Sequence, residues 1–198
     1  MMIFISGISG VGKSTISKEL SQQLGLLHIN QDNYYLKIKP KVTLSNNLQK
    51  SNWDTVEALD FDKLNADLTN HFYQRQNFLL EGFCVRKDMI KFTPNVHIHL
   101  SYIPVPHDAN IVDVYMKNKE IIINRIIKSR STSKPGIKDD EIVVRELVWP
   151  FYIETLKNSH IDYVLNTFDD TGNRIDLNII MDKVMQILIM EGIVNVRI

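Results

Sequence analysis

The chain has 198 residues, of which 44% are hydrophobic, and its 23 basic side chains are balanced by 23 acidic ones. This length and hydrophobic content suit one domain, residues 1–198, with a single core. The balanced charge gives no basic field that would attract nucleic acid, so we expect no nucleic-acid partner.

Disulfide bonds and membrane attachment are also disfavoured. The one cysteine, Cys84, cannot form an intrachain disulfide, which fits a reducing compartment. The N-terminal apolar run is short and has no basic residues before it, unlike a secretory signal. Residues 178–196 are apolar but interrupted by charged side chains, as in an amphipathic core helix. We therefore expect a cytoplasmic protein, a monomer or a homodimer, that does not bind membranes.

The clearest motif is residues 7–15, Gly-Ile-Ser-Gly-Val-Gly-Lys-Ser-Thr, which fits the phosphate-binding loop pattern G-x-x-x-x-G-K-[ST]. A phosphate-binding loop needs a strand before it and a helix after it. An apolar run precedes this motif and an amphipathic segment follows it, so the context disfavours a chance match. Backbone N–H groups of such a loop point at a polyphosphate. Lys13 would reach the β- and γ-phosphates, and the Ser14 hydroxyl would hold Mg²⁺. The predicted ligands are therefore ATP and Mg²⁺, and the predicted nucleotide-binding residues are Gly7, Ser9, Gly10, Val11, Gly12, Lys13, Ser14 and Thr15.

Strand-like and helix-like runs alternate along the chain, which is typical of an α/β fold with a mostly parallel sheet and helices on both faces. Gly25 is expected to end the first helix and Asp60 to cap the second. The predicted strands are residues 2–5, 26–29, 78–82, 111–116 and 161–166, and the predicted helices are residues 13–24, 60–75, 120–130, 139–158 and 175–191.

Three details of this pattern rest on weaker signals. Residues 96–102 also alternate like a strand, but residues 111–116 are preferred as the fourth core strand because a helical run follows them directly. Residues 37–52 have no clean period and are predicted to be a surface loop. Pro150 is expected to kink the helix that contains it.

A phosphate-binding loop alone does not separate a kinase from a GTPase, a transporter ATPase or a motor. GTPases read guanine with an Asn-Lys-x-Asp tetrapeptide, and the nearest candidate, residues 118–121, lacks the final Asp. Nothing resembles a transporter signature. The class that remains is a small-molecule kinase, which needs an acid to accept a proton, Mg²⁺ ligands and a cationic lid.

Two acids follow predicted strands and could do this chemistry. Asp32 comes just after the second strand and is the candidate base, although it could instead cap a turn before Asn33. Glu81 ends an apolar strand, so its charge must be exposed there or meet a cation. A place in the Mg²⁺ shell or against the substrate is favoured over a simple strand terminator. The predicted metal-binding set is Ser14, Asp32 and Glu81.

Several further segments occur in the order and style of nicotinamide riboside kinases, and the chain resembles this family over most of its length. The segments Asp-x-x-Glu-Ala-Leu at 54–59 and Val-Trp-Pro at 148–150 are more particular than the phosphate-binding loop. The others are residues 7–15, 31–35, 80–83, 130–132 and 151–152. These kinases belong to the uridine kinase-like group of P-loop kinases. The resemblance implies the P-loop NTPase fold with a five-stranded sheet of order 2-3-1-4-5 and a small lid.

The resemblance also implies an activity and roles for single residues. The activity is transfer of the γ-phosphoryl group of ATP to the 5′-hydroxyl of a ribonucleoside, in this family nicotinamide riboside, to give nicotinamide mononucleotide. Asp32 is similar to the family's catalytic base, Asp54 to the residue that binds the ribose diol, and Arg130 to its supporting arginine. Trp53 stands where the family places an aromatic ring against nicotinamide. The catalytic residues are then Asp32 and Lys13, and the substrate-binding residues are Asp32, Tyr35, Trp53, Asp54, Glu81 and Arg130.

These roles agree with simple chemistry. A carboxylate such as Asp54 can accept two hydrogen bonds from a vicinal diol. Trp53 offers a good face to a cationic pyridinium, whereas neutral uracil would gain only stacking. The plainer alternatives are a half-buried packing role for Trp53 and a solvated helix-end cation for Arg130.

Some residues depart from the family pattern. In the predicted lid, residues 128–140, Pro135 and Ser133 stand where the family carries an aromatic residue and an arginine, and Lys128 or Lys134 could compensate. Residues 87–110 look like an insertion. Its histidines, His97, His99 and His107, could suggest a metal, but alternating His on a strand more often faces solvent. Cys84 is expected to be a packed thiol.

Three other functions remain open. Uridine or cytidine could be the acceptor. A regulatory protein could bind ATP without catalysis, as the changes in the lid would allow. A kinase for a different polyol or sugar acid would keep Asp54 in its pocket while Trp53 points away.

Overall fold

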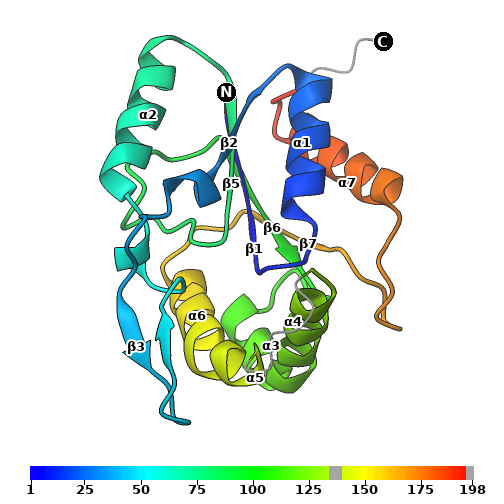
Figure 1. Cartoon of the computed structure of the whole chain (residues 1–198). Helices are drawn as coiled ribbons and strands as arrows, with labels where there is room; N and C mark the ends of the chain where they lie inside the picture. Colours follow the sequence, from blue (N-terminus) through cyan, green and yellow to red (C-terminus); the bar gives the residue numbers. More distant parts are fainter. Residues whose placement is uncertain (134–139, 195–198) are drawn as a thin grey trace.

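The centre of the molecule is a five-stranded parallel sheet (Figure 1), seen in a computed structural model that describes residues 1–133 and 140–194. Its strand order is β2-β5-β1-β6-β7, which is the predicted order 2-3-1-4-5. The strands are β1 (Met2–Gly7), β2 (Leu27–Asn30), β5 (Phe78–Gly82), β6 (Val96–Ser101) and β7 (Tyr163–Asn166). β1 lies in the middle, so the phosphate-binding loop leaves the sheet at its centre.

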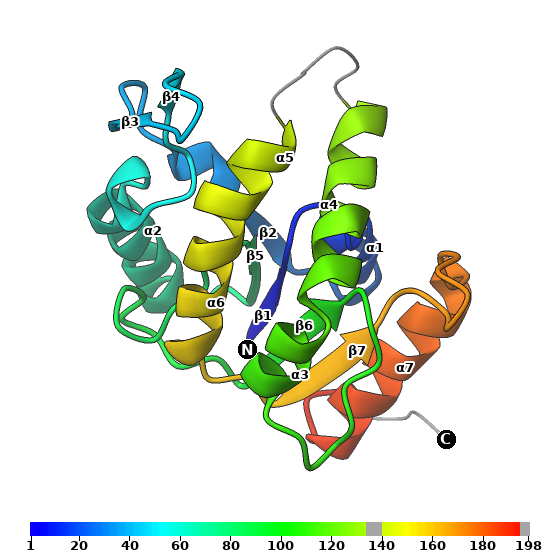
Figure 2. The same ribbon diagram turned by 90° about the horizontal axis from the view of Figure 1, so that it is seen from below.

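Helices cover both faces of this sheet (Figure 2). On β1, Ile3 and Ile5 face α1 (Lys13–Leu24) and α7 (Leu177–Met190), whereas Phe4 and Ser6 face α2 (Phe61–Tyr73) and α6 (Trp149–Lys157). The predicted caps are confirmed. Gly25 ends α1 with φ 63°, and the Asp60 side chain accepts a hydrogen bond from the Lys63 N–H.

The fourth core strand was predicted wrongly. Residues 96–101 form β6, inside the range predicted as an insertion, and residues 111–117 form helix α3 (Ile111–Lys117). The Asn110 side chain accepts hydrogen bonds from the N–H groups of Val112 and Asp113 and so caps this helix. Asn110 was the missed signal, because an apolar run that follows an N-cap residue reads as a helix start.

The connection before β6 is fixed by α2. The Asn65 carboxamide donates to the carbonyl of Met89 at 2.8 Å and accepts from the N–H of Lys91 at 2.9 Å. One side chain therefore replaces two main-chain partners and holds the loop between β5 and β6 against the helix.

Two more segments differ from the sequence prediction. The predicted loop of residues 37–52 contains an antiparallel hairpin, β3 (Lys41–Thr43) and β4 (Gln49–Ser51). The short helices η1 (Gln31–Tyr34) and η2 (Val56–Ala58) flank it. The Ser45 N–H at the hairpin tip donates to Glu146 Oε2 at 3.0 Å.

The helices after β6 form the rest of the shell. α4 (Lys119–Ser133) precedes the undescribed residues 134–139, and α5 (Asp140–Val143) follows them. A π-helical stretch, η3 (Val144–Val148), joins α5 to α6, and the Trp149 N–H donates to the carbonyl of Val144. Pro150 has no N–H for an α-helical bond, so the expected irregularity takes the form of this π stretch. In residues 1–133 and 140–194, no helix is both long and apolar enough to cross a membrane.

Candidate active site

The phosphate-binding loop joins β1 to α1 in a backbone shape that requires glycine. Gly10 and Gly12 have φ of 87° and 100°. A Cβ at Gly10 would collide with the side chain of Ser129 and the hydroxyl of Tyr102. Gly12 is the N-cap of α1 and provides no side-chain cap, so the first N–H groups of α1 stay available to an anion.

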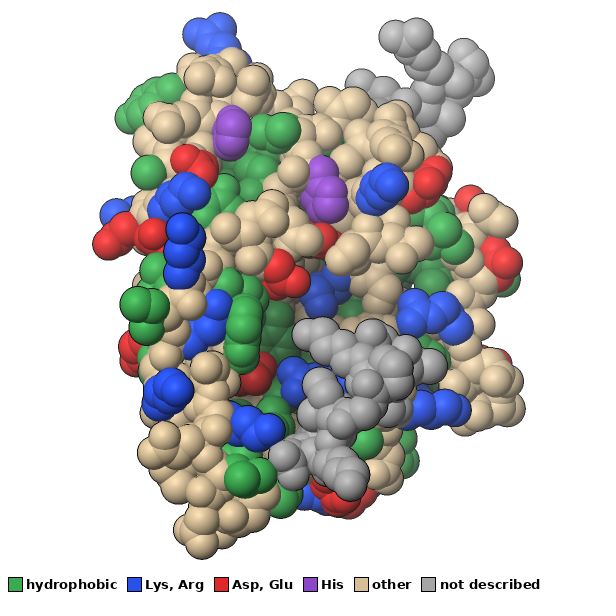
Figure 3. Space-filling model, in the orientation of Figure 1, with side chains coloured by type: hydrophobic (Ala, Val, Ile, Leu, Met, Phe, Trp, Pro, Cys, Tyr) green, Lys and Arg blue, Asp and Glu red, His purple; other side chains and the backbone are tan. Residues whose placement is uncertain are grey.

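A cavity of about 520 Å³ opens at this loop. Figure 3 shows acidic and basic side chains meeting in the middle of one face of the molecule. The cavity lining combines the loop with the ends of β2 and β5 and with the segment that leads into α7. Its residues are Ser9, Gly10, Gly12, Lys13, Ser14, Thr15, Ile16, Asn30, Asp32, Glu81, Gly82, Arg174, Ile175, Leu177 and Ile180.

Lys13 is held at the bottom of the loop. Its Nζ donates to the carbonyl of Ile8 at 3.1 Å. Burial lowers the pKa of Lys13, and the charges of Asp32 and Glu81 oppose that shift. The lysine and the two acids therefore form one electrostatic group, and a bound polyphosphate would also favour the charged ammonium.

Glu81 is the most unusual residue of this group, because it is 1% exposed. Within the described residues neither of its carboxylate oxygens has a hydrogen-bond partner. His28 Nε2 lies 3.3 Å from Glu81 Oε1, close enough for an ion pair, but it also makes no hydrogen bond there. Since a buried carboxylate is costly without a partner, this orphaned acid beside Ser14 fits a Mg²⁺ ion or its water shell.

Asp32 is exposed in the same cavity, and the side chains of its neighbours Asn30 and Gln31 stabilise the turn. Asn30 caps η1 by accepting from the Asp32 N–H at 2.8 Å, so the alternative that Asp32 is the capping residue does not apply. The Gln31 carboxamide donates to the carbonyl of Cys84 at 2.7 Å and accepts from its N–H at 2.8 Å. Gln31 thereby links η1 to the end of β5, a tie that the sequence analysis missed.

The predicted acceptor-binding residues form a second group beside the first. Burial raises the pKa of Asp54, and Arg130 opposes this with its Nη2 4.0 Å from Asp54 Oδ2. Tyr35 joins the two groups. Its N–H donates to the carbonyl of Asp32 at 3.4 Å, and its ring packs against Trp53, which precedes Asp54. Burial and the charges of Asp32 and Asp54 together raise the pKa of Tyr35.

Trp53 lies at the edge of this second group and is 48% exposed. Tyr35 packs edge-on against it with ring centroids 5.1 Å apart. Lys39 Nζ lies 3.6 Å from the centroid of the Trp53 ring, so a cation already covers one face of this ring.

The sequence analysis also missed residues that support the loop from the far side. Arg174 Nη2 donates to the carbonyl of Gly10 at 2.7 Å, and its guanidinium lies 5.0 Å from the ring of Phe168. The Tyr102 hydroxyl donates to the carbonyl of Ser9 at 2.8 Å. The segment before α7 falls between the predicted strand of residues 161–166 and the predicted closing helix, and no local sequence signal marked Arg174.

Other predictions about this region have mixed outcomes. His97 and His99 are 2% and 1% exposed, so the expectation that they face solvent was wrong, because α6 covers their face of the sheet. Cys84 is a packed thiol as predicted, and burial raises its pKa to about 12. No group of three His, Cys, Asp or Glu side chains in the described parts of the chain could hold a metal. Pro135 and the Ser133 side chain lie outside the described residues.

The loop, the central parallel sheet and the acids at its strand ends define a P-loop protein with the fold of the P-loop kinases. The AAA domain family model matches residues 6–143, and the chain belongs to this family.

Relatives and solved structures agree with this class. The chain is 31% identical over 116 residues to a uridine kinase of Clostridium perfringens, a match that covers 57% of this chain and 51% of the relative. It is 32% identical over 124 residues to a cytidylate kinase of Desulforamulus reducens, covering 62% and 49%. The chain thus spans about half the length of these relatives. A sugar kinase structure from Janibacter aligns with 98% of both chains at a TM-score of 0.54 and 15% identity, which supports the fold alone.

Proposed function

We propose that this protein is a kinase that transfers the γ-phosphoryl group of ATP to the 5′-hydroxyl of a ribonucleoside. The main support is the way one residue joins two acidic sites. The Tyr35 N–H donates to the carbonyl of Asp32, which lines the cavity at the phosphate-binding loop, and the Tyr35 ring packs against Trp53, the neighbour of Asp54. A donor held at the loop and an acceptor held at Asp54 would meet at Asp32.

Each residue has a part in this reaction. Lys13 and the loop N–H groups would neutralise the phosphates, and Asp32 would orient the acceptor hydroxyl and take its proton. Ser14, Asp32 and Glu81 would hold Mg²⁺, which when bound adds positive charge to the phosphates. Asp54 would accept hydrogen bonds from the ribose diol, with Arg130 in support.

The resemblance to nicotinamide riboside kinases makes nicotinamide riboside the first acceptor to test. The contact between Lys39 and Trp53 favours a second candidate, uridine or cytidine. A cationic nicotinamide ring would have to displace Lys39 or use the other face of Trp53, because two cations repel each other. A neutral pyrimidine avoids this repulsion.

The direct experiment incubates the protein with ATP, Mg²⁺ and one acceptor at a time, and measures ADP release. The acceptors are nicotinamide riboside, uridine, cytidine and gluconate, and ATP affinity is measured separately. We expect ADP formation that depends on a nucleoside. ATP binding with equal background for all acceptors would instead support the regulatory protein, and release only with gluconate would support the sugar-acid kinase.

A variant at Lys39 tests the choice of base. In Lys39→Ala the kcat/KM for nicotinamide riboside should rise about fivefold or more relative to that for uridine, because the competing cation is removed. Lys63→Ala is the matched control, since Lys63 Nζ lies 5.6 Å from the ring of Tyr34 on the α2 side of the site. If the ratio of the two kcat/KM values is unchanged in Lys39→Ala, the nicotinamide ring does not stack on Trp53.

A further inference from the structure

A second cavity, of about 350 Å³, lies between the sheet and the loop that joins β5 to β6. Phe4 of β1 and His97 of β6 line it from the sheet, and most of the other lining residues belong to residues 85–94 of the loop. It shares no lining residue with the cavity at the phosphate-binding loop. Pockets of this size hold small organic molecules. This cavity is therefore a candidate site for a ligand that the kinase reaction does not use.

The inner surface of this second cavity is apolar. Phe4, Val85 and Ile90 line it, are buried, and belong to one hydrophobic cluster. Phe92, which also lines the cavity, packs against the same cluster. Free energy is gained when a hydrocarbon group replaces water at such a surface. The inner part of the cavity therefore suits an apolar body, such as an aromatic ring.

The outer part of the lining carries positive charge. Lys87 and Lys91 line the cavity and are exposed, so they lie at its mouth. In the part of the chain that the structure describes, neither ammonium group forms a hydrogen bond or an ion pair. None of the described residues that line the cavity is an Asp or a Glu. An anionic group at the mouth would thus meet two cations that no carboxylate already holds.

Arg86 and His160 also line the cavity, but each already has an acidic partner. Arg86 donates to both carboxylate oxygens of Asp88, from Nε at 2.9 Å and from Nη2 at 2.6 Å. His160 Nε2 lies 3.1 Å from Asp162 Oδ1. The attraction of an anion therefore depends mainly on the two lysines.

The loop that forms the outer wall is held in place from both sides. The Ser159 hydroxyl donates to the carbonyl of Val85 at 2.6 Å, and the Lys87 N–H donates to the carbonyl of Asn158 at 2.9 Å. These bonds tie the loop to the end of α6, and the Asn65 carboxamide ties it to α2. The cavity is thus formed by the fold itself, so that binding requires little ordering of the chain.

The same hydrogen bonds disfavour a phosphate group as the ligand. A phosphate site on a loop uses backbone N–H groups that point at the anion. The N–H groups of Lys87, Ile90 and Lys91 already donate to other groups of the protein. A carboxylate, which carries a single charge, can be held by the lysine side chains alone.

We propose that this cavity binds a small organic anion with an apolar body and one carboxylate. The body would lie against Phe4, Val85 and Ile90, and the carboxylate beside Lys87 and Lys91. The site is separate from the phosphate-binding loop, and the proposal does not depend on the kinase reaction.

The test ligand is 2-naphthoate, and its comparison is 2-naphthamide, which has the same rings but no charge. In NMR titrations of the wild-type protein, 2-naphthoate should bind with a Kd of about 1 mM or below. It should bind at least fivefold more tightly than 2-naphthamide. The methyl signals of Val85 and Ile90 should shift, because the naphthalene rings lie against them. The affinity should be the same with and without saturating ADP.

A double variant tests the role of the two lysines. In Lys87→Gln/Lys91→Gln the affinity for 2-naphthoate should fall at least fivefold, while that for 2-naphthamide stays unchanged. Lys117→Gln/Lys183→Gln is the matched control, because it removes two exposed lysines that line neither cavity, and its affinities should equal those of the wild-type protein.

Four results would contradict the proposal. Displacement of 2-naphthoate by ADP would place the anion at the phosphate-binding loop. Equal affinities for the charged and the neutral compound would show that the lysines attract no anion. Unchanged affinity in Lys87→Gln/Lys91→Gln would show the same, and equal losses in both double variants would mean that only the net charge of the protein matters.

Discussion

Asp32 and Glu81 lie in one cavity but in opposite environments. Glu81 is almost fully buried and its carboxylate has no hydrogen-bond partner among the described residues, whereas Asp32 is exposed. A buried carboxylate without hydrogen-bond partners is stabilised by a cation that reaches it. The exposed one is free to meet an acceptor hydroxyl. Under the proposed function, Glu81 would therefore serve only the metal, whereas Asp32 would reach the metal and also accept the proton.

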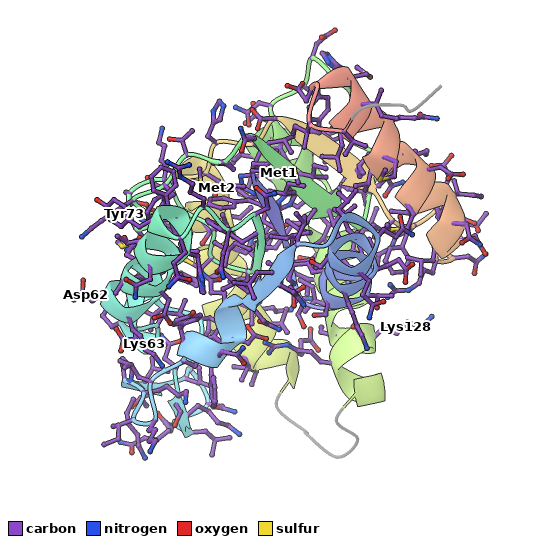
Figure 4. The ribbon with its side chains drawn as sticks, turned by 90° about the horizontal axis from the view of Figure 1, so that it is seen from above. Met1, Met2, Asp62, Lys63, Tyr73 and Lys128 are labelled. Carbon is purple, nitrogen blue, oxygen red and sulfur yellow. The ribbon has the colours of Figure 1, made fainter. Side chains whose placement is uncertain are left out.

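This division predicts the behaviour of one variant. Asp32→Asn should lower kcat by about 10² to 10⁴, because the amide cannot take the proton, while ATP affinity changes little. Asp62→Asn makes the same chemical change on the outer side of α2 (Figure 4) and should leave kcat unchanged. Stopped assays of ADP release and a separate ATP titration measure both quantities. If Asp32→Asn turns over at the wild-type rate, Asp32 is not the general base.

Single residues differ in how far the sequence could place them. Lys13 and Ser14 line the cavity at the loop because the loop motif carries its own geometry, while their roles stay predictions. The burial of His97 and His99 was missed because period-two alternation cannot tell a solvated face from a face that a distant helix covers. Arg174 was missed because its contact with Gly10 spans 164 residues, and no local pattern encodes such a pairing.

The phosphate-binding loop tolerates no side chain at Gly10. Gly10→Ala should place a Cβ against Ser129 and Tyr102 in a backbone region that disfavours side chains, so nucleotide affinity should fall at least tenfold and the protein should be less stable. Gly25→Ala is the control, since φ is also positive there but no atom lies within 4 Å. It should cost about 1 kcal/mol and leave ADP affinity intact. Urea unfolding and ADP titration of both variants check this, and equal loss of affinity would contradict it.

Element types were predictable where caps or motifs mark the ends, as for α1 and α2. The wrong assignment of β6 and α3 shows the limit, because a short apolar run fits either period. Only a signal at its end, such as the Asn110 cap of α3, separates the two structures. The hairpin of β3 and β4 was not predicted, since it is a small separate sheet with exposed, polar strands and no hydrophobic alternation.

At the scale of the whole molecule, the buried imidazole groups make stability depend on pH. His97 has a pKa of about 4 in the folded protein against an ordinary 6.5, so the unfolded chain binds a proton over this range and the folded chain does not. The free energy of unfolding should therefore fall as pH drops from about 6.5 to about 4, by about 3 kcal/mol from His97 alone. His99 acts in the same direction.

Urea unfolding at a series of pH values measures this dependence. His97→Gln should show a shallower loss of stability between pH 6.5 and 4 than the wild-type protein, even if it is less stable at pH 7.5. Parallel curves for the two proteins would mean that His97 is not the group that titrates.

The π-helical stretch of η3 sets the rotation of two helical surfaces relative to each other. Each of its hydrogen-bonded turns holds one residue more than a turn of α-helix, as in the bond from the Trp149 N–H to the carbonyl of Val144. Arg145 and Glu146 lie within the stretch, and Tyr152 follows it. Deleting one residue there would turn the preceding side chains by about 100° if α6 stayed in the core. Glu146 would then point away from Ser45, and Arg145 away from Glu120. The extra residue thus sets the angle between Glu146, which contacts the β3–β4 hairpin, and Tyr152, which contacts His99 on the sheet.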